Sequence, residues 1–453
     1  MMDREFIILQ DAFRRLIRRN ARSNTQKIIM KTHPADLAAL FRSFTEVERE
    51  MVFKLISDRT YKAEFLTELD RSILVEILED MVPKDIAELL SEMAPDDQAD
   101  LLAHIPAVLG KEVLGLMSSA DSEDLEELMM YEPDTAGGIM VPLQFKMNEH
   151  NTVQDTIDAI HEQKDVEMVF YIYIVDDDNR LTGVISLRQL LMISPKTVLR
   201  NTMITKLVTV QPETDQEEVA RIISRYNFLA LPVIDRDNLL LGIITVDDII
   251  DVIREEATED FLQMAGVGKD REILLKTPFE AARIRFPWLF ATFIGGLIVS
   301  AIVVGFHDLL NQFVILAAFM PIVAGMGGNV GSQSSTIIVR GLATGRINFQ
   351  QIFKVLGGQV IIGLILGVAF GVLLTLFSNL FYHLTNNILL IGTVIGVSLC
   401  CELIIAATLG TLVPMVLQRI NVDPAIATSP IVSTSLDITG MLVYFSIATA
   451  LLM

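Results

Sequence analysis

The sequence predicts a multidomain membrane protein with three parts: an all-α N-terminal domain of helical repeats, an α/β domain built from a tandem repeat, and an all-α transmembrane domain of five helices. Mean hydropathy is +0.46 although the 453 residues carry a formal net charge of −21, so apolar and acidic residues must occupy different parts of the chain. Only four of the 57 Asp and Glu residues fall in residues 287–453, where four Lys and Arg balance them. We expect domains at residues 1–131, 132–245, 246–285 and 286–453, the third being an acidic connecting helix.

Charge and cysteine usage exclude several classes of protein. A nucleic-acid binder needs a basic face to neutralise phosphates, and the polar part of this chain has the opposite sign. A secreted disulfide scaffold does not fit, because the only cysteines, Cys400 and Cys401, are adjacent within an apolar run. Residues 1–20 have the pattern of an amphipathic helix and not of a signal peptide, so we expect a cytoplasmic N-terminus.

Residues 1–131 contain short amphipathic units that begin with proline and an acid. The units start at His33 (HPADLAALF), Val82 (VPKDIAELLSEM) and Ala94 (APDDQADLLAHI), and the last two are twelve residues apart. Proline in the first turn followed by Asp is a favourable start for a helix. The pattern predicts a stack of short helices, which is typical of an interaction or regulatory domain.

A second repeat occupies the segment from Asp134 to Asp251. The sequence from Val169 aligns with that from Phe228 at an offset of 59, which places Ser186 on Thr245. Two apolar strands around an acidic turn, followed by Ser or Thr and a helix, resemble the CBS module, which works as a tandem pair. The resemblance implies a cleft that often binds adenosine nucleotides, so adenine nucleotide is a possible second ligand.

In CBS modules, a Ser or Thr and an Asp after the second strand usually hold ribose and phosphate. Thr245 and Asp248 match this pair in the second module, whereas the first module has Ser186 but Gln189 in place of the acid. The candidate nucleotide-binding residues are Tyr171, Arg188 and Phe228.

A dense acidic segment follows the second module. Seven acids lie between positions 247 and 260, namely Asp247, Asp248, Asp251, Glu255, Glu256, Glu259 and Asp260. On a helix, like charges at three- and four-residue spacing repel by about 0.2–0.5 kcal/mol per pair. The face is either simply solvated or screened by divalent cations, since carboxylates are hard oxygen ligands suited to Mg²⁺ or Ca²⁺.

Five apolar stretches are long enough to cross a bilayer. They run approximately over Pro287 to Phe306, Phe313 to Val339, Val355 to Phe377, Ile388 to Leu417 and Ala425 to Met453, with Pro414 and Pro430 as candidate break points. Every Lys and Arg in the connecting loops falls on the side of the polar domains. The positive-inside rule therefore predicts a multi-pass protein of the plasma or inner membrane with its C-terminus outside.

Two ionisable residues lie within the predicted spans, and such residues are candidates for function. Glu402 stands among apolar residues and could be a neutral acid or a helix–helix hydrogen-bonding group. Asp437 is surrounded by Ser, Thr and Gly, and the second span has a polar, glycine-rich centre at residues 325–336. We expect a cation pathway lined by a carboxylate, hydroxyls and backbone carbonyls, which suits a hydrated cation such as Mg²⁺. The candidate pore residues are Gly328, Asn329, Gln333, Ser433, Asp437 and Gly440.

Several long segments together resemble the MgtE family of magnesium channels and transporters. They are PDTAGGIMVP from Pro133, EEATED from Glu255, GGNVGSQSSTIIVRGLATG from Gly327 and VDPAIATSPIVSTSLDITGMLVYF from Val422. The resemblance implies a homodimeric Mg²⁺ channel in membrane lipid, with Asp437 in the pore, Asp423 at its cytoplasmic mouth, and the acidic segment as a plug helix. Cytosolic Mg²⁺ would bridge acids of the three cytosolic parts and close the pore. The matching metal-ligand candidates are Glu92, Asp96, Glu217, Asp248, Asp251, Glu256 and Glu259.

The chain departs from the family pattern at Asn227, where an acid is usual, and at Ser429, where Asn is common. Other substrates remain open: Co²⁺, Mn²⁺ or Ca²⁺, or a proton-coupled carrier in which Glu402 titrates. A membrane-anchored nucleotide sensor would leave the polar spans unexplained. We expect no enzymatic activity, because an intramembrane aspartyl protease needs two facing carboxylates and Asp437 has only Glu402 as a candidate partner.

Overall fold

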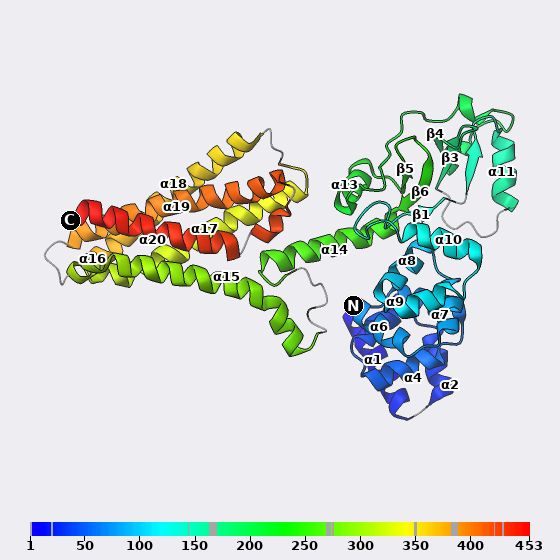
Figure 1. Cartoon of the computed structure of the whole chain (residues 1–453), viewed down its shortest axis with the longest axis horizontal. Coiled ribbons are helices and arrows are strands. Elements are labelled where there is room, and N and C mark those ends of the chain that lie inside the picture. Colours follow the sequence, from blue (N-terminus) through cyan, green and yellow to red (C-terminus); the bar gives the residue numbers. More distant parts are fainter. Residues whose placement is uncertain are drawn as a thin grey trace. The chain divides into compact units, whose positions relative to one another are not determined.

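A computed structural model describes the chain except for residues 1, 20, 144, 163–169, 269–272, 274–275, 348–350, 382–387, 421 and 428–429. The chain divides into two compact units, Met1–Ile253 and Arg254–Met453 (Figure 1). The division falls inside one helix, α14 (Val246–Met264), which contains the whole acidic segment. Position 429, where the sequence departs from the family pattern, lies outside the described residues.

The first unit begins with ten helices among its described residues. They are α1 (Met2–Arg18), α2 (Arg22–Ile29), α3 (Pro34–Phe41), α4 (Glu46–Leu55), α5 (Arg59–Thr67), α6 (Arg71–Glu79), α7 (Pro83–Leu90), α8 (Pro95–His104), α9 (Ala107–Leu114) and α10 (Ser119–Leu128). Proline occupies the first turn of α3, α7 and α8, as the sequence predicts. Aromatic rings fill the core, with Phe41 and Phe65 edge to face at 4.7 Å between centroids. The prediction of stacked short helices is confirmed.

Two three-stranded sheets follow among the described residues. The elements are β1 (Val141–Pro142), β2 (Lys146–Asn148), α11 (Val153–Glu162), β3 (Tyr171–Val175), β4 (Leu181–Ser186), α12 (Leu187–Leu190), the 3₁₀ helix η1 (Leu199–Asn201), α13 (Gln216–Tyr226), β5 (Ala230–Ile234) and β6 (Leu240–Thr245). The sheet orders are β2-β3-β4 and β1-β6-β5. Both β3 to β5 and β4 to β6 are related by the predicted offset of 59 residues, so the tandem repeat is confirmed.

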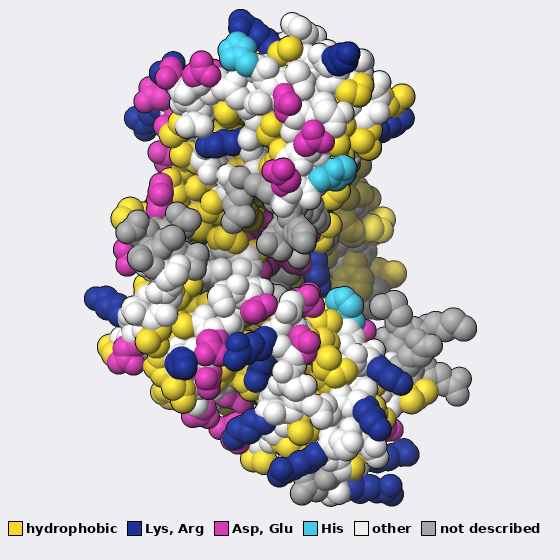
Figure 2. Space-filling model, turned by 90° about the vertical axis from the view of Figure 1, so that its right-hand side faces the viewer, with side chains coloured by type: hydrophobic (Ala, Val, Ile, Leu, Met, Phe, Trp, Pro, Cys, Tyr) yellow, Lys and Arg dark blue, Asp and Glu magenta, His cyan; other side chains and the backbone are white. Residues whose placement is uncertain are grey.

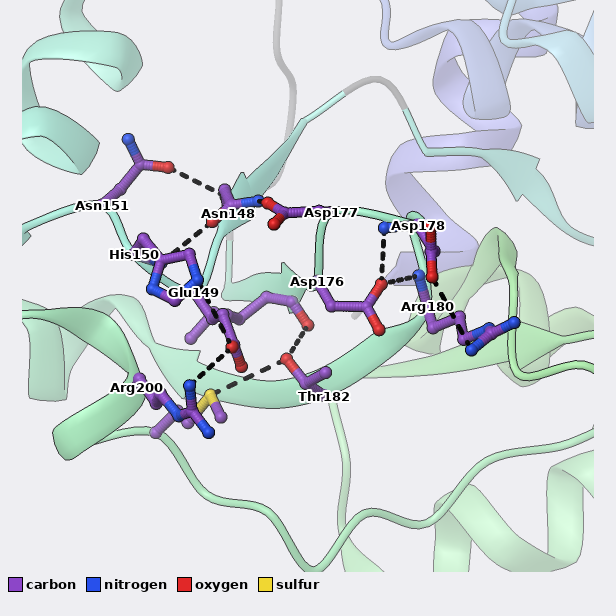
Figure 3. A network of polar contacts seen from close by, with 12 residues as sticks. Asn148, Glu149, His150, Asn151, Asp176, Asp177, Asp178, Arg180, Thr182 and Arg200 are labelled. Atoms are coloured by element: carbon purple, nitrogen blue, oxygen red, sulfur yellow. Dashed lines mark hydrogen bonds and ion pairs between the residues drawn. The ribbon is translucent and has the colours of Figure 1, made fainter.

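The acidic turns of the two modules have a structural role. Asp176 Oδ1 accepts hydrogen bonds from the backbone N–H groups of Asp178 and Arg180, both at 2.9 Å (Figure 3). Asp235 repeats this turn in the second module, accepting from residues 237 and 239. These two carboxylates therefore use one oxygen to close a turn, and part of the negative charge of the chain stabilises the fold.

The second unit contains the transmembrane domain. Its described elements are α15 (Pro278–Gly305), α16 (His307–Gln312), α17 (Ile315–Ala343), α18 (Ile352–Phe381), α19 (Ile388–Arg419), the 3₁₀ helix η3 (Pro424–Ala427) and α20 (Pro430–Leu452). Among the described residues, five helices are long and apolar enough to cross a membrane. Figure 1 shows them side by side, and α19 contacts α17, α18 and α20. A Cβ added to Gly410 of α19 would lie 2.3 Å from the carbonyl oxygen of Gly331, so glycine permits this close approach of α17 and α19.

Three details of the spans differ from the sequence expectations. Helix α15 begins at Pro278 after a Thr277 capping box, nine residues before the predicted start, and continues through Pro287. Pro414 lies inside a continuous α19 and does not break it, whereas Pro430 starts α20. The glycine-rich centre of α17 is helical throughout. Its carbonyls therefore serve the helix, and side chains have to supply most of the ligands of a cation pathway.

Candidate functional site

One cluster of acids lies in the first unit, where α8 and α14 begin. Asp96 and Asp97 stand in the first turn of α8, where the helix dipole favours negative charge. Asp248 stands in the first turn of α14. Burial, with repulsion from neighbouring acids as the second cause, raises the pKa of each of these three carboxyls to about 7. The ends of two helices far apart in sequence thus bring acids within electrostatic range.

This acidic cluster contains a carboxylate oxygen that could accept a further hydrogen bond or bind a cation. Asp96 Oδ1 is buried and has no hydrogen-bond partner among the described residues. The Thr245 hydroxyl donates to one oxygen of Asp248. Among the described residues no three Asp, Glu, His or Cys side chains are close enough to hold a metal ion. The cluster is therefore a surface of coupled carboxylates without a preformed cage.

The remaining predicted ligands of the cytosolic region lie in other surroundings. Glu92 is exposed and accepts a hydrogen bond from the Thr60 hydroxyl at 3.0 Å. Glu217 lies 4.0 Å from Arg221 on its own helix, α13. Asp251 is exposed and Glu256 is half-buried, both on α14. Of the predicted cytosolic set, Asp96 and Asp248 are brought together, and Asp97 joins them.

On the face of the molecule shown in Figure 2, acidic side chains are interspersed with Lys and Arg. The basic side chains gather at the lower end, where Figure 1 places the first helices. The net charge of −21 is therefore not spread evenly over this face. Local clusters of acidic side chains decide where cations are attracted.

The second module has the predicted nucleotide-binding pair, and the first has Ser186 with Gln189 in place of the acid. Thr245 bonds to Asp248, and Ser186 bonds to Gln189 in a capping box at the equivalent position. Of the other candidates, Arg188 is exposed, Tyr171 is half-buried beside Tyr173, and Phe228 stacks on Tyr226 with centroids 5.3 Å apart. Nothing in these contacts selects a nucleotide.

Asn227, one of the two departures from the family pattern, has a local structural explanation. It ends α13 with φ of 53° in the left-handed region, which Asn adopts more readily than most residues.

A second arrangement of candidate ligands lies in the second unit. Asp423 Oδ1 accepts from the N–H of Ala425 at 2.8 Å and so caps η3. Its Oδ2 accepts from Nε2 of Gln263 at 2.9 Å, and the same nitrogen lies 2.9 Å from Glu259 Oε1. The structure thus joins two predicted ligands through an amide that sequence reasoning missed. The only available signal was the spacing of four residues between Glu259 and Gln263 on a helix.

The candidate pore residues lie on α17 and α20. Asp437 is half-buried, one turn after Ser433 on α20. Gly328 faces Ser433, because a Cβ on this glycine would lie 3.8 Å from the serine hydroxyl oxygen. Asn329 and Gln333 are one turn apart on α17 and exposed, so the polar stripe of this membrane helix is not covered by the described part of one chain.

Glu402 lies at the middle of α19 with no exposed surface. Both of its carboxyl oxygens lack a hydrogen-bond partner among the described residues. A Cβ on Gly327 of α17 would lie 2.3 Å from Glu402 Oε1, and a Cβ on Gly440 of α20 would lie 2.6 Å from the same atom. The carboxyl group therefore occupies the space that side chains at Gly327 and Gly440 would need. The candidate pore residue Gly440 thus lies against Glu402.

Comparison with known proteins agrees with this domain order. The family model described as MgtE, a divalent cation transporter, matches residues 320–447, and that of the MgtE intracellular N domain matches residues 32–134. The CBS domain model matches residues 138–196 and 198–255. The magnesium transporter MgtE of Bacillus subtilis (strain 168) is 38% identical over 338 residues, which cover 74% of either chain. The chain belongs to the MgtE family of magnesium transporters.

Two further MgtE proteins extend the comparison. The magnesium transporter MgtE of Thermus thermophilus is 37% identical over 339 residues, again 74% of either chain. A crystal structure of the cytosolic domain of the Mg²⁺ channel MgtE in complex with ATP is 35% identical, with a TM-score of 0.50 over 55% of this chain and 99% of that one. The chain is accordingly a multi-pass membrane protein of a transporter family, with the N domain and CBS pair that MgtE proteins carry.

Proposed function

We propose that this MgtE protein is a Mg²⁺ channel that moves Mg²⁺ into the cytoplasm and closes when cytosolic Mg²⁺ binds its acids. The observation that carries the transport role is Asp437, a half-buried carboxylate one turn after Ser433 in a membrane helix. A carboxylate in a span is costly unless it faces water or a cation. Since Mg²⁺ gives up its water reluctantly, a pathway of one carboxylate and neutral polar groups suits it.

The polar stripe of α17 supports a homodimer. Asn329 and Gln333 are exposed on one chain at a depth where lipid offers no hydrogen bonds. A second copy related by a twofold axis would cover such a stripe and bring two Asp437 side chains to one pathway. The distribution of loop bases supports an orientation with the N-terminus in the cytoplasm and the C-terminus outside.

The cluster of Asp96, Asp97 and Asp248 supports closure by cytosolic Mg²⁺. A cation bound there would cancel the repulsion that raises these pKa values and hold the starts of α8 and α14 together. Because the ion binds better to the joined arrangement than to the separated one, it shifts the population toward the closed state. Adenine nucleotide is a second proposed ligand, at the Thr245 and Asp248 pair of the CBS domain.

Electrophysiology on the full chain reconstituted in a planar bilayer tests this function. Mg²⁺ is varied on the cytosolic face while current is carried from the other side, with Ca²⁺, Mn²⁺ and Co²⁺ as competing charge carriers and two pH values to detect proton coupling. We expect Mg²⁺ current that falls as cytosolic Mg²⁺ rises. Asp437→Asn should abolish the current while insertion is retained, and Mg²⁺ current that survives this substitution removes Asp437 from the pathway.

A further inference from the structure

Gln263, in the last turn of α14, is the most buried polar side chain of that helix, with 2% of its surface exposed. Its Nε2 lies 2.9 Å from Glu259 Oε1 and 2.9 Å from Asp423 Oδ2, so the two N–H bonds of one amide serve two carboxylates. Its Oε1 is buried and has no hydrogen-bond partner among the described residues. One side chain thus connects α14 with the segment that leads into α20.

The chemistry of this contact differs from that of a cation bridge. Two carboxylates around one nitrogen repel each other, and a divalent cation would offset this by charge. A neutral amide offsets it by hydrogen bonds to charged acceptors, which are stronger than neutral ones. The amide is part of the chain, so it is present at every Mg²⁺ concentration. Its cost is the buried carbonyl oxygen, which has no donor among the residues that the structure describes.

The backbone around Asp423 makes the contact specific. Asp423 Oδ1 accepts from the N–H of Ala425, which fixes the direction of the carboxylate, and Oδ2 accepts from Gln263. Glu259 lies one turn before Gln263 on the same helix, so the amide is oriented from its own side as well. Displacing α14 from η3 would break the bond to Asp423 and keep the bond to Glu259.

We propose that Gln263 is a positioning residue that holds the end of α14 on the Asp423 segment without a cation, so that part of the closing free energy is independent of Mg²⁺. The proposal rests on the proposed function, in which this segment is the cytoplasmic mouth of the pore. Cytosolic Mg²⁺ then adds to a contact between α14 and the Asp423 segment that the amide already makes. The Mg²⁺ concentration needed for closure is therefore lower than it would be if the acids alone held the closed state.

Two substitutions at Gln263 distinguish the effect of its hydrogen-bond donors from the effect of its size and shape. Gln263→Met keeps the length and helix preference of the side chain and removes both donors. Gln263→Glu keeps the shape and adds a third carboxylate to the pair. Thr258→Ala is the matched control, because Thr258 is exposed on α14 and its hydroxyl donates to the carbonyl of Arg254 on the same helix.

We expect Gln263→Met to raise the cytosolic Mg²⁺ concentration for half-closure about tenfold, since hydrogen bonds to charged groups have about this effect. Gln263→Glu should open more than wild type without Mg²⁺ but close more steeply when Mg²⁺ is added, because three carboxylates bind the cation better than two. A merely structural role would shift both variants alike. Closure of Gln263→Met at the wild-type concentration overturns the proposal, and so does the same shift in both variants.

A distance measurement makes the test independent of current. Spin labels at the exposed positions Phe261 and Ile420, in a Cys400→Ser, Cys401→Ser background, report the separation of α14 from the end of α19 in the presence of EDTA. We expect one narrow distance distribution in the otherwise wild-type chain and a broad one with Gln263→Met. An unchanged narrow distribution overturns the proposal. Absence of Mg²⁺ current in wild type would instead overturn the proposed function, and the distance result would stand alone.

Discussion

The carboxyl group of Glu402 occupies the space that a side chain at Gly440 would need. A Cβ at position 440 would lie 2.6 Å from Oε1 and 2.8 Å from Oε2, closer than a carbon and an oxygen can approach. The same carboxyl meets Gly327 on α17, so one side chain of α19 sets the spacing of the two helices that carry all candidate pore residues.

Gly440→Ala should therefore displace α20 from α19. We expect a loss of stability of about 1–3 kcal/mol from overpacking, together with loss of Mg²⁺ flux. The measurement is thermal unfolding in detergent beside flux into liposomes. Gly325→Ala on α17 is the control, because no atom lies within 4 Å of its added Cβ and a helical Gly→Ala change is favourable. Equal behaviour of the two variants would show that the notch at Gly440 is not tightly filled.

Glu402 itself should act by its shape and not by a charge. Its two oxygens have no donor among the described residues and no exposed surface, and an ionised carboxylate in such a place is expensive. We expect Glu402→Gln to keep the stability and Mg²⁺ flux of wild type, and Glu402→Ala to lose about 2–4 kcal/mol through the cavity it leaves. If Glu402→Gln abolishes flux while the unfolding temperature is unchanged, the charge of Glu402 belongs to the transport pathway.

The acidic cluster of the first unit predicts an unusual dependence of stability on pH. The pKa of Asp97 is about 7 in the folded protein and near 4 when unfolded, so the folded state binds more protons between these values. This contribution is complete below about pH 4 and is lost as pH rises through 7. In EDTA, the unfolding temperature of the helices of the first unit should thus fall between pH 5 and 8, and Mg²⁺ should reduce the fall.

Asp97→Asn tests this dependence, because it removes one titrating group. Circular dichroism of the full chain in detergent should show a flatter dependence of stability on pH. Near pH 8 the free energy of unfolding should be higher by about 1–2 kcal/mol than in wild type. The gain is smaller than the full pKa shift would give, because the half-buried site is partly screened by solvent. Glu79→Gln, exposed on α6, is the control for a general change of charge. A wild-type profile that is flat in EDTA contradicts burial of these carboxyls.

The tandem repeat and the helix starts were predictable because local pattern determines them. The offset of 59 recurs in strand ends and also in the left-handed turn residues Asn179 and Asn238. Proline at the start of α8 marks that helix because its missing N–H costs nothing there. Pro414 does not break α19, although a proline inside a helix removes one backbone hydrogen bond. Within a membrane bundle, neighbouring helices support a helix that has lost such a bond.

The candidate site was less predictable because its contacts join distant residues. The bond between Gln263 and Asp423 spans 160 positions, and neither its partner nor its burial follows from an amide on an acidic helix. Burial of Glu402 depends on glycines of two other helices. Glu92 has the right residue type for a metal ligand, but in the turn after α7 its carboxylate accepts a hydrogen bond from Thr60, and only the fold decides between such uses of a carboxylate.

Acids that close turns should be separable from acids that respond to Mg²⁺. Asp235 Oδ1 accepts from the N–H groups of residues 237 and 239 at 2.9 and 2.7 Å, which is a structural use of its charge. Asp235→Ala should lower stability by about 0.5–1.5 kcal/mol, because two backbone N–H groups of the exposed turn lose their acceptor, without changing the cytosolic Mg²⁺ concentration for half-closure. Asp248→Asn should do the reverse, raising that concentration with little loss of stability, since the amide can still bond to Thr245. Parallel measurement of unfolding temperature and closure in both variants checks the assignment. A shift of closure in Asp235→Ala as large as that in Asp248→Asn would mean that the acidic turns also take part in sensing the cation.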